Sequence, residues 1–219
     1  MRIYITGSAR SGTTLLGRLF YAFEDVTVID AEIELEYFVQ ASGIETEHYS
    51  GKRSVATIFS NDLNDGALRQ QEMMIKSNDI KIVNIMRDGR DVVHKPEKGT
   101  QCTPRRWIAC MEQVDRYGYL IDCNIYYEDL VTEPNETQAL VAHGLGFKRP
   151  KIKHAWSDYP AFVPDKAFET RSTQGFPLYG PRTIEPSKHD PNFYKTLPMG
   201  KAEYDSFERW LDIYDHRDL

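Results

Sequence analysis

The first segment of the chain has the order strand, glycine-rich turn, helix, and this order constrains the fold more than any other feature. The apolar run Ile3–Ile5 leads into Gly7-Ser8-Ala9-Arg10-Ser11-Gly12-Thr13-Thr14, and the amphipathic stretch 15–23 follows. In such a turn successive backbone N–H groups point into one concavity, and the helix behind it adds partial positive charge. The segment therefore predicts a cradle for an anionic phosphoryl or sulfuryl group.

The chain continues with short apolar runs separated by stretches of helical periodicity. We expect strands at 3–6, 26–29, 80–86 and 120–127, and helices at 13–23, 32–41, 65–75, 104–117, 137–143 and 201–214. This alternation predicts an α/β fold in which helices flank a parallel sheet. A length of 219 residues fits a single domain, which we place at 1–219.

The segment 147–200 differs from the rest because prolines interrupt it and periodicity is weak. Long irregular segments of this kind are typical of lids and binding loops, or are partly disordered. The aromatic residues of this segment favour a packed lid or binding loop over disorder. A helix at 201–214 then ends the predicted fold.

Charge and composition exclude several classes of function. The net charge of −6 argues against a general nucleic-acid binder, which needs a basic face. The sequence contains no apolar run of 18 residues, so we expect no membrane insertion. The predicted first strand begins too early to leave room for a signal peptide. The three cysteines and six histidines lack metal-ligand or disulfide spacing. We therefore expect a cytoplasmic protein without a bound metal.

The glycine turn departs from the Walker form at one position. Thr13 stands where a nucleotide triphosphatase carries Lys, and the cation is Arg10, ahead of the second glycine. A turn that lacks the Walker Lys but has a basic residue before Ser-Gly-Thr-Thr resembles the 5′-phosphosulfate loop of sulfotransferases. The resemblance implies the P-loop-type α/β fold that sulfotransferases share with nucleotide kinases.

A second motif follows the predicted strand 80–86. Ligands of open parallel sheets bind beyond the carboxyl ends of the strands, and here the chain reads Arg87-Asp88-Gly89-Arg90-Asp91-Val92-Val93. The segment resembles the 3′-phosphate-binding motif of sulfotransferases, which implies that Arg87 holds this phosphate. The family's Ser in this motif is replaced by Lys95, which can still bind phosphate as a point charge. Alternatively, Arg87 and Arg90 form surface ion pairs with Asp88 and Asp91.

Two weaker matches lie farther along the chain. The stretch Tyr126-Tyr127-Glu128-Asp129-Leu130 resembles the family's strand-ending Tyr-Glu-Asp-Leu, and we expect its two carboxylates to stabilise the start of a helix. Ser172-Thr173 and the segment 182–186 resemble the part of the family that closes over the donor nucleotide. This match implies a donor contact for Arg182.

Together the motifs resemble the tyrosylprotein and bacterial branches of the sulfotransferases that use 3′-phosphoadenosine 5′-phosphosulfate (PAPS). The resemblance implies that the N–H groups of Ser11, Gly12, Thr13 and Thr14 hold the 5′-phosphate, that Arg10 stabilises the transferring group and that no metal is required. The acceptor must lose a proton to a base. The resemblance implies Glu32 for this role, with Asp30 and Glu34 as competitors and His94 as an outside candidate. Alternatively, the three carboxylates only solvate the start of a helix.

Two other functions fit the sequence. One is a small-molecule or nucleotide kinase with an atypical P-loop that uses Mg²⁺ and ATP, and the other is a nucleotide-binding protein without catalysis. The acceptor of a sulfotransferase would be a small molecule, a carbohydrate or a peptide, and aromatic side chains of the irregular segment suit any of these. A lipid acceptor is also compatible with the sequence.

Overall fold

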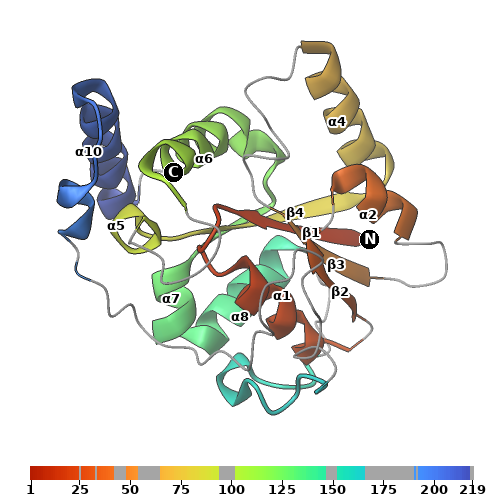
Figure 1. The fold of residues 1–219 in the computed structure, drawn as a ribbon. Helices are drawn as coiled ribbons and strands as arrows, with labels where there is room; N and C mark the ends of the chain where they lie inside the picture. Colours follow the sequence, from red (N-terminus) through yellow and green to blue (C-terminus); the bar gives the residue numbers. More distant parts are fainter. Residues whose placement is uncertain are drawn as a thin grey trace.

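Five parallel strands form one sheet at the centre of the protein (Figure 1). The computed structural model describes residues 1–24, 26–32, 34–41, 48–53, 65–93, 102–146, 152–165, 190 and 192–217. The strands are β1 (Arg2–Gly7), β2 (Val26–Glu32), β3 (His48–Arg53), β4 (Ile80–Met86) and β5 (Cys123–Tyr126), in the spatial order β2-β3-β1-β4-β5. The mixed α/β architecture with a parallel sheet is thus confirmed.

The central strands are apolar because helices cover both faces of the sheet. Side chains alternate between the faces, so Ile3 and Ile5 contribute to one core cluster and Tyr4 to the other. Residues 82 and 83 of β4 divide between the clusters in the same way. Near-continuous apolar runs of this kind are typical of strands buried on both faces.

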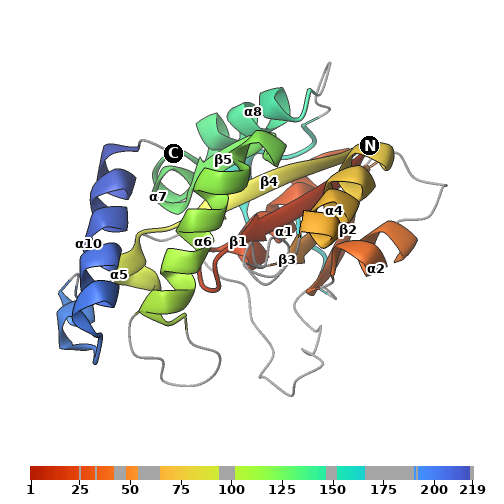
Figure 2. The same ribbon diagram turned by 90° about the horizontal axis from the view of Figure 1, so that it is seen from above.

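Helices on the two faces belong to different parts of the chain (Figures 1 and 2). One face packs against α1 (Thr13–Leu19), which continues as a 3₁₀ turn over Phe20–Ala22, and against α8 (Pro134–Gly144). The opposite face packs against α2 (Leu35–Ala41), α4 (Asp65–Ser77), α6 (Pro104–Tyr117) and α10 (Lys201–His216). The short helices α5 (Gly89–Val92) and α7 (Tyr127–Thr132) follow β4 and β5 directly.

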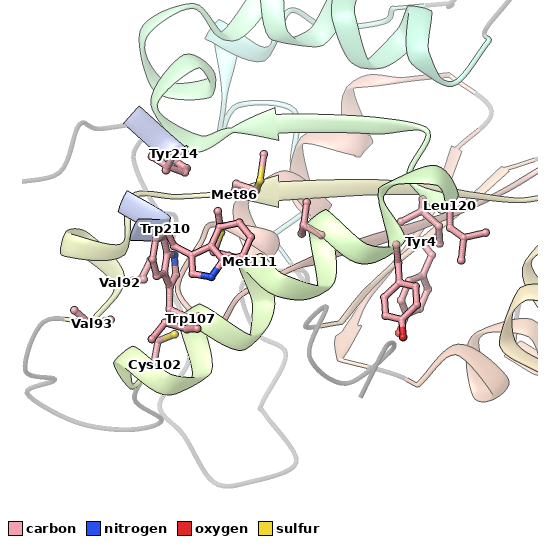
Figure 3. Packing of buried hydrophobic residues seen from close by; sticks show 14 of the residues in the cluster. Tyr4, Met86, Val92, Val93, Cys102, Trp107, Met111, Leu120, Trp210 and Tyr214 are labelled. Carbon is pink, nitrogen blue, oxygen red and sulfur yellow. The ribbon is translucent and has the colours of Figure 1, made fainter. Parts of the chain in front are cut away.

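The larger core cluster joins α6 and α10 to the sheet (Figure 3). Trp107 is fully buried, and its ring lies 4.9 Å from the ring of Phe207 of α10. Met111, Trp210 and Tyr214 are buried in the same cluster. This packing places the C-terminal helix α10 beside α5 and α6, from which it is far away in the sequence.

Several predicted boundaries are wrong, and the largest error concerns β2. The predicted helix 32–41 begins only at Leu35, because β2 extends through Glu32. The strand β3 was not predicted, because His-Tyr-Ser-Gly-Lys-Arg contains neither an apolar run nor an alternating pattern. The sheet accepts this sequence because β3 pairs with β1 on one side and β2 on the other.

Other elements differ less from their predicted extent. The predicted strand 120–127 is shorter, since Leu120 ends a 3₁₀ turn (Gly118–Leu120) and Tyr127 begins α7. The helix predicted at 137–143 begins at Pro134 and ends at Gly144. The first helix is α-helical only to Leu19. The predicted helices 104–117 and 65–75 match α6 and most of α4.

Part of the irregular segment packs on the face covered by α1. Residue Ile152 forms an isolated antiparallel bridge with Phe23, and the indole of Trp156 is fully buried. Its Nε1–H donates a hydrogen bond to the Leu19 carbonyl at 2.9 Å. Trp156 belongs to a 3₁₀ turn (Trp156–Asp158), and a further 3₁₀ turn (Phe193–Thr196) precedes α10. Across the described ranges, no helix combines the length and apolar character needed to cross a membrane.

Replacing Trp156 should test how strongly this segment is fastened to the core. We expect Trp156→Ala to lower the free energy of unfolding by about 3–5 kcal/mol, because it removes a large buried ring. Trp156→Phe retains most of the apolar contact and should cost less. Urea denaturation followed by circular dichroism measures both values, and equal losses for the two variants would contradict the prediction.

Candidate anion-binding site

The glycine turn and the Arg87 motif meet where the direction of the chain connections reverses. From β1 the chain passes toward β3 and β2, whereas from β4 it passes to β5 on the other side. In open parallel sheets, ligands bind at the carboxyl ends of strands at such a switch point. Here β1 ends at Gly7 and its neighbour β4 ends at Met86, so both motifs flank this position.

Contacts inside the glycine turn fix its shape. The Ser8 carbonyl accepts hydrogen bonds from the Ser11 N–H at 3.1 Å and from the Ser11 hydroxyl at 2.7 Å. Ser11 is fully buried. The backbone of Arg10 has φ 73°, a left-handed conformation that non-glycine residues adopt at a cost. Ser11 thus shapes the turn, and its N–H, which was predicted to contact an anion, donates to the Ser8 carbonyl instead.

Gly12 begins α1 in a conformation and position that suit only glycine. Its φ is +102°, and a Cβ there would lie 2.7 Å from the ring of Tyr127. As the N-cap, Gly12 offers no side-chain acceptor to the first turn of α1. The first N–H groups of a helix have no acceptor within the helix. The N–H groups of Thr13 and Thr14 are therefore suited to an anion.

The guanidinium of Arg87 spans the switch point from the end of β4. Its Nη1 donates to the Arg10 carbonyl at 3.2 Å, and its Cζ lies 4.0 Å above the centre of the Tyr127 ring. The Nε is 3.6 Å from a carboxylate oxygen of Asp91. The Arg87 carbonyl in turn accepts the indole N–H of Trp107 at 3.1 Å. Arg87 thus contacts the glycine turn and also forms an ion pair with Asp91, as the ion-pair alternative predicted.

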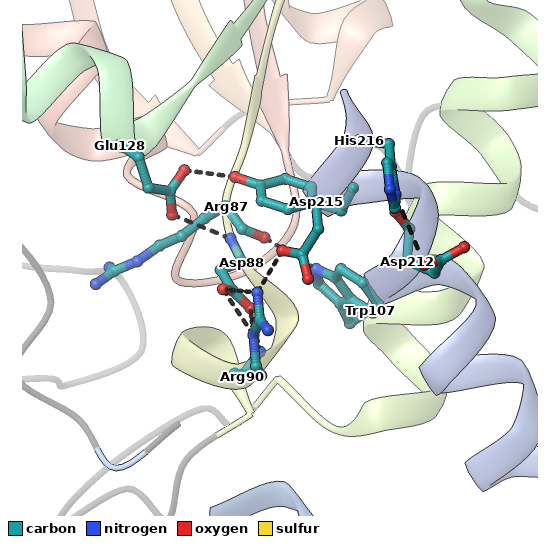
Figure 4. A network of polar contacts seen from close by, with 9 residues as sticks. Arg87, Asp88, Arg90, Trp107, Glu128, Asp212, Asp215 and His216 are labelled. Carbon is teal, nitrogen blue, oxygen red and sulfur yellow. Dashed lines mark hydrogen bonds and ion pairs between the residues drawn. The ribbon is translucent and has the colours of Figure 1, made fainter. Parts of the chain in front are cut away.

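Arg90 has a different role from Arg87. Its Nε lies 2.8 Å from both carboxylate oxygens of Asp88, and its Nη2 contacts Asp215 of α10. The hydrogen bond to Asp88, with smaller help from Asp215, raises the pKa of Arg90 further above its usual value. Figure 4 shows the Arg87 side chain pointing away from this group. The ion-pair alternative is therefore correct for Arg90 and Asp88.

The end of α10 contributes residues that the sequence analysis missed. The Tyr214 hydroxyl donates to Glu128 Oε2, and Glu128 Oε1 accepts the Asp88 N–H at 3.2 Å. Arg217 pairs with Asp129 at 2.7 Å. The carboxylates of Glu128 and Asp129 lie in the first turn of α7, as predicted. They also bind the C-terminal end of α10 through Tyr214 and Arg217. In the sequence, only the helical spacing of Phe207, Trp210 and Tyr214 indicates that α10 packs against the rest of the protein.

The predicted base residues lie within a strand rather than after it. Both Asp30 and Glu32 belong to β2, and Glu32 pairs in register with Lys52 of β3, which pairs with Ile5 of β1. Strands lie about 4.8 Å apart, so Glu32 starts about 10 Å from β1 across the sheet. The structure does not describe the side chains of Asp30 and Glu32. Lys95, Arg182 and His94 lie outside the described residues.

The thiol of Cys102, which precedes α6, adds an electrostatic detail near Arg10. Burial raises the pKa of Cys102 to about 12, with a contribution from Cys110, while the charges of Arg106 and Arg10 act in the opposite direction. Burial likewise raises the pKa of Cys123 to about 11. Both thiols are therefore protonated near neutral pH. All three cysteines are buried thiols.

Comparison with known proteins gives no assignment: no family model matches the chain, and no curated protein matches it. Within the described parts of the chain, no group of three or more His, Cys, Asp or Glu side chains is arranged to hold a metal ion. The site is therefore defined by its geometry.

Gly12→Ala should disrupt this geometry. The added Cβ meets the Tyr127 ring and forces a strained backbone, so we expect a loss of about 1–3 kcal/mol in the free energy of unfolding. Gly118→Ala is the matched control, since no atom lies within 4 Å of its Cβ position and its φ is −53°. Chemical denaturation measures both, and an unchanged stability of Gly12→Ala would contradict the close contact.

The raised thiol pKa values predict slow alkylation. At pH 8 Cys102 should be alkylated at least about 10-fold more slowly in the folded protein than in the unfolded chain, because burial raises its pKa to about 12 and shields the sulfur from the reagent. Iodoacetamide labelling followed by peptide mass spectrometry measures the rate at Cys102 and Cys123 with and without urea. Equal rates in both conditions would refute the prediction.

Proposed function

We propose that this protein is a sulfotransferase that moves a sulfuryl group from PAPS to a hydroxyl or amine acceptor. The single observation that carries the proposal is the contact between Arg87 and the Arg10 carbonyl at 3.2 Å. This contact brings two basic motifs, distant in the sequence, to one edge of the sheet. We also propose that the fold is of the P-loop type.

A donor with two separate phosphate groups suits this arrangement. The glycine turn and the start of α1 would bind the 5′-phosphosulfate, and Arg87 would bind the 3′-phosphate from the end of the neighbouring strand. The guanidinium of Arg87 stacks on Tyr127, which limits its motion, and its planar fork suits bidentate binding of a phosphate. The resemblance adds Lys95 and Arg182 as further contacts to the donor nucleotide.

The chain's own residues would act mainly by positioning and by stabilising charge. In the transfer, the acceptor oxygen or nitrogen bonds to sulfur while the bond from sulfur to the bridging phosphate oxygen breaks, and the acceptor proton passes to a base. Arg10 is exposed beside the turn and would stabilise the charge that develops on the leaving oxygen. Glu32 is the proposed base and Asp30 its competitor.

The proposed site does not define one acceptor. A small molecule, a carbohydrate or a peptide would approach from the edge formed by β2 and β3, because the proposed bases lie on β2. The donor itself needs no metal, since it carries no triphosphate chain. The kinase alternative, in contrast, requires Mg²⁺ with ATP.

Calorimetric titration with adenosine 3′,5′-bisphosphate, with and without Mg²⁺ and beside ATP, tests the proposal. We expect micromolar binding that does not depend on Mg²⁺ and that Arg87→Ala weakens by 10-fold or more, about 1.4 kcal/mol. Arg116→Ala, at an exposed arginine in the last turn of α6, removes the same positive charge away from the carboxyl ends of the strands and controls for a change of charge alone.

The other outcomes of this titration each have a definite meaning. A preference for ATP with Mg²⁺ would replace the proposal by the kinase, and failure to bind either nucleotide would overturn nucleotide chemistry at this site. If the bisphosphate binds as expected, an acceptor screen with labelled PAPS should give turnover that Glu32→Gln abolishes. Unchanged turnover in that variant, with loss in Asp30→Asn, would move the role of base to Asp30.

A further inference from the structure

The last turn of α10 touches both segments that follow β4 and β5. The Tyr214 hydroxyl donates to one oxygen of Glu128, and the other oxygen accepts the Asp88 N–H at 3.2 Å. Asp88 directly follows Arg87 in the chain. One carboxylate therefore connects the C-terminal helix to the backbone beside the proposed phosphate-binding arginine.

A second connection runs through Asp215. This residue contacts Nη2 of Arg90, and the same guanidinium makes short contacts with both oxygens of Asp88 (Figure 4). Asp88 Oδ1 also accepts the Arg90 N–H at 2.8 Å and so caps α5. Because Arg90 neutralises Asp88, this carboxylate does not compete for Arg87. The guanidinium of Arg87 instead contacts the glycine turn and the carboxylate of Asp91.

The connection through Tyr214 is shielded from water. Tyr214 is 3% exposed, and its ring lies 5.3 Å from the ring of Tyr126 in an edge-to-face arrangement. Burial, followed by the nearby charge of Glu128, raises the pKa of Tyr214. Arg217 and Asp88 also face this group, and the charge of Arg217 opposes the shift. The phenol therefore stays protonated and donates to Glu128.

We infer that Tyr214 and Asp215 are positioning residues of the anion site. They act through Glu128, Asp88 and Arg90 to hold the turn after β4, so that Arg87 meets the second phosphate of the ligand. This inference rests on the proposed function. It assigns to the C-terminal helix a part in selecting ligands with two phosphate groups over ligands with one.

The test compares two nucleotides on variants of the full chain. Calorimetry with adenosine 3′,5′-bisphosphate and adenosine 5′-monophosphate gives two dissociation constants for the wild type, Tyr214→Phe and Asp215→Asn. Tyr214→Phe removes the hydrogen bond to Glu128, and Asp215→Asn removes the charge that pairs with Arg90. We expect each substitution to weaken binding of the bisphosphate by about fivefold and to change binding of the monophosphate less than about twofold. The preference between the two ligands should therefore fall.

Asp212→Asn is the matched control. It removes the same charge from the same helix, but Asp212 is 77% exposed and pairs only loosely with His216, at 3.6 Å. We expect it to leave both dissociation constants unchanged. Melting temperatures are measured for all variants, because a purely structural role would lower the melting temperature without changing the ligand preference.

Each outcome decides between the two proposals. A reduced preference in Tyr214→Phe and Asp215→Asn, with none in Asp212→Asn, supports positioning by α10. Wild-type binding of the bisphosphate with an unchanged preference in both variants overturns the inference and leaves the proposed function standing. Wild-type protein that binds neither nucleotide overturns both.

Discussion

The arrangement of the candidate site depends on the contacts of one buried side chain, the indole of Trp107. It is fully buried, its N–H donates to the Arg87 carbonyl, and its ring packs against Phe207 of α10. A Cβ on Gly89 would lie only 2.8 Å from the same ring, so α5 can approach α6 closely because residue 89 is glycine. One side chain thus fixes the turn after β4, the start of α6 and the C-terminal helix relative to one another. A buried aromatic ring with a satisfied N–H suits this role because it combines large contact area with one directional bond.

Most charged side chains at the carboxyl edge of the sheet pair with one another, and Arg87 differs from them in its contacts. The ion pairs join Arg90 to Asp88 and Asp215, and Arg217 to Asp129. The carboxylate of Glu128 accepts the backbone N–H of Asp88. Partly exposed ion pairs contribute little to global stability, so their main effect is on local geometry. Arg87 differs from them because its contacts are a carbonyl, an aromatic face and a carboxylate at 3.6 Å. A phosphate in direct contact would form charge-assisted hydrogen bonds with this guanidinium, which the carbonyl and the aromatic face do not.

The sequence predicted the parts of the fold that depend on local patterns. The strands β1 and β4 could be predicted because burial on both faces of the sheet requires apolar residues. The glycine turn could be predicted because its left-handed backbone favours glycine. The strand β3 could not be predicted, since its polar sequence becomes a strand only through pairing with β1 and β2. The extension of β2 through Glu32 was missed for the same reason, as its last register pair with Lys52 follows an irregularity after Val28. Asp30 was therefore placed after the strand and Glu32 at the start of the next helix, whereas both belong to β2.

The site was predictable only in its two motifs, because its remaining parts come from tertiary contacts. Nothing in the local sequence of Tyr214 or Asp215 distinguishes them from other residues of an amphipathic helix. Their partners Glu128 and Arg90 lie 86 and 125 residues away. If Arg87 binds a ligand as proposed, such contacts would couple that binding to the docking of α10. A ligand that binds the native arrangement stabilises it by mass action, so the C-terminal helix would be held more firmly in the bound protein than in the free one. Because α10 packs mainly through Phe207, Trp210 and Tyr214, its docking depends chiefly on apolar burial, while its last turn determines the geometry of the charges beside Arg87.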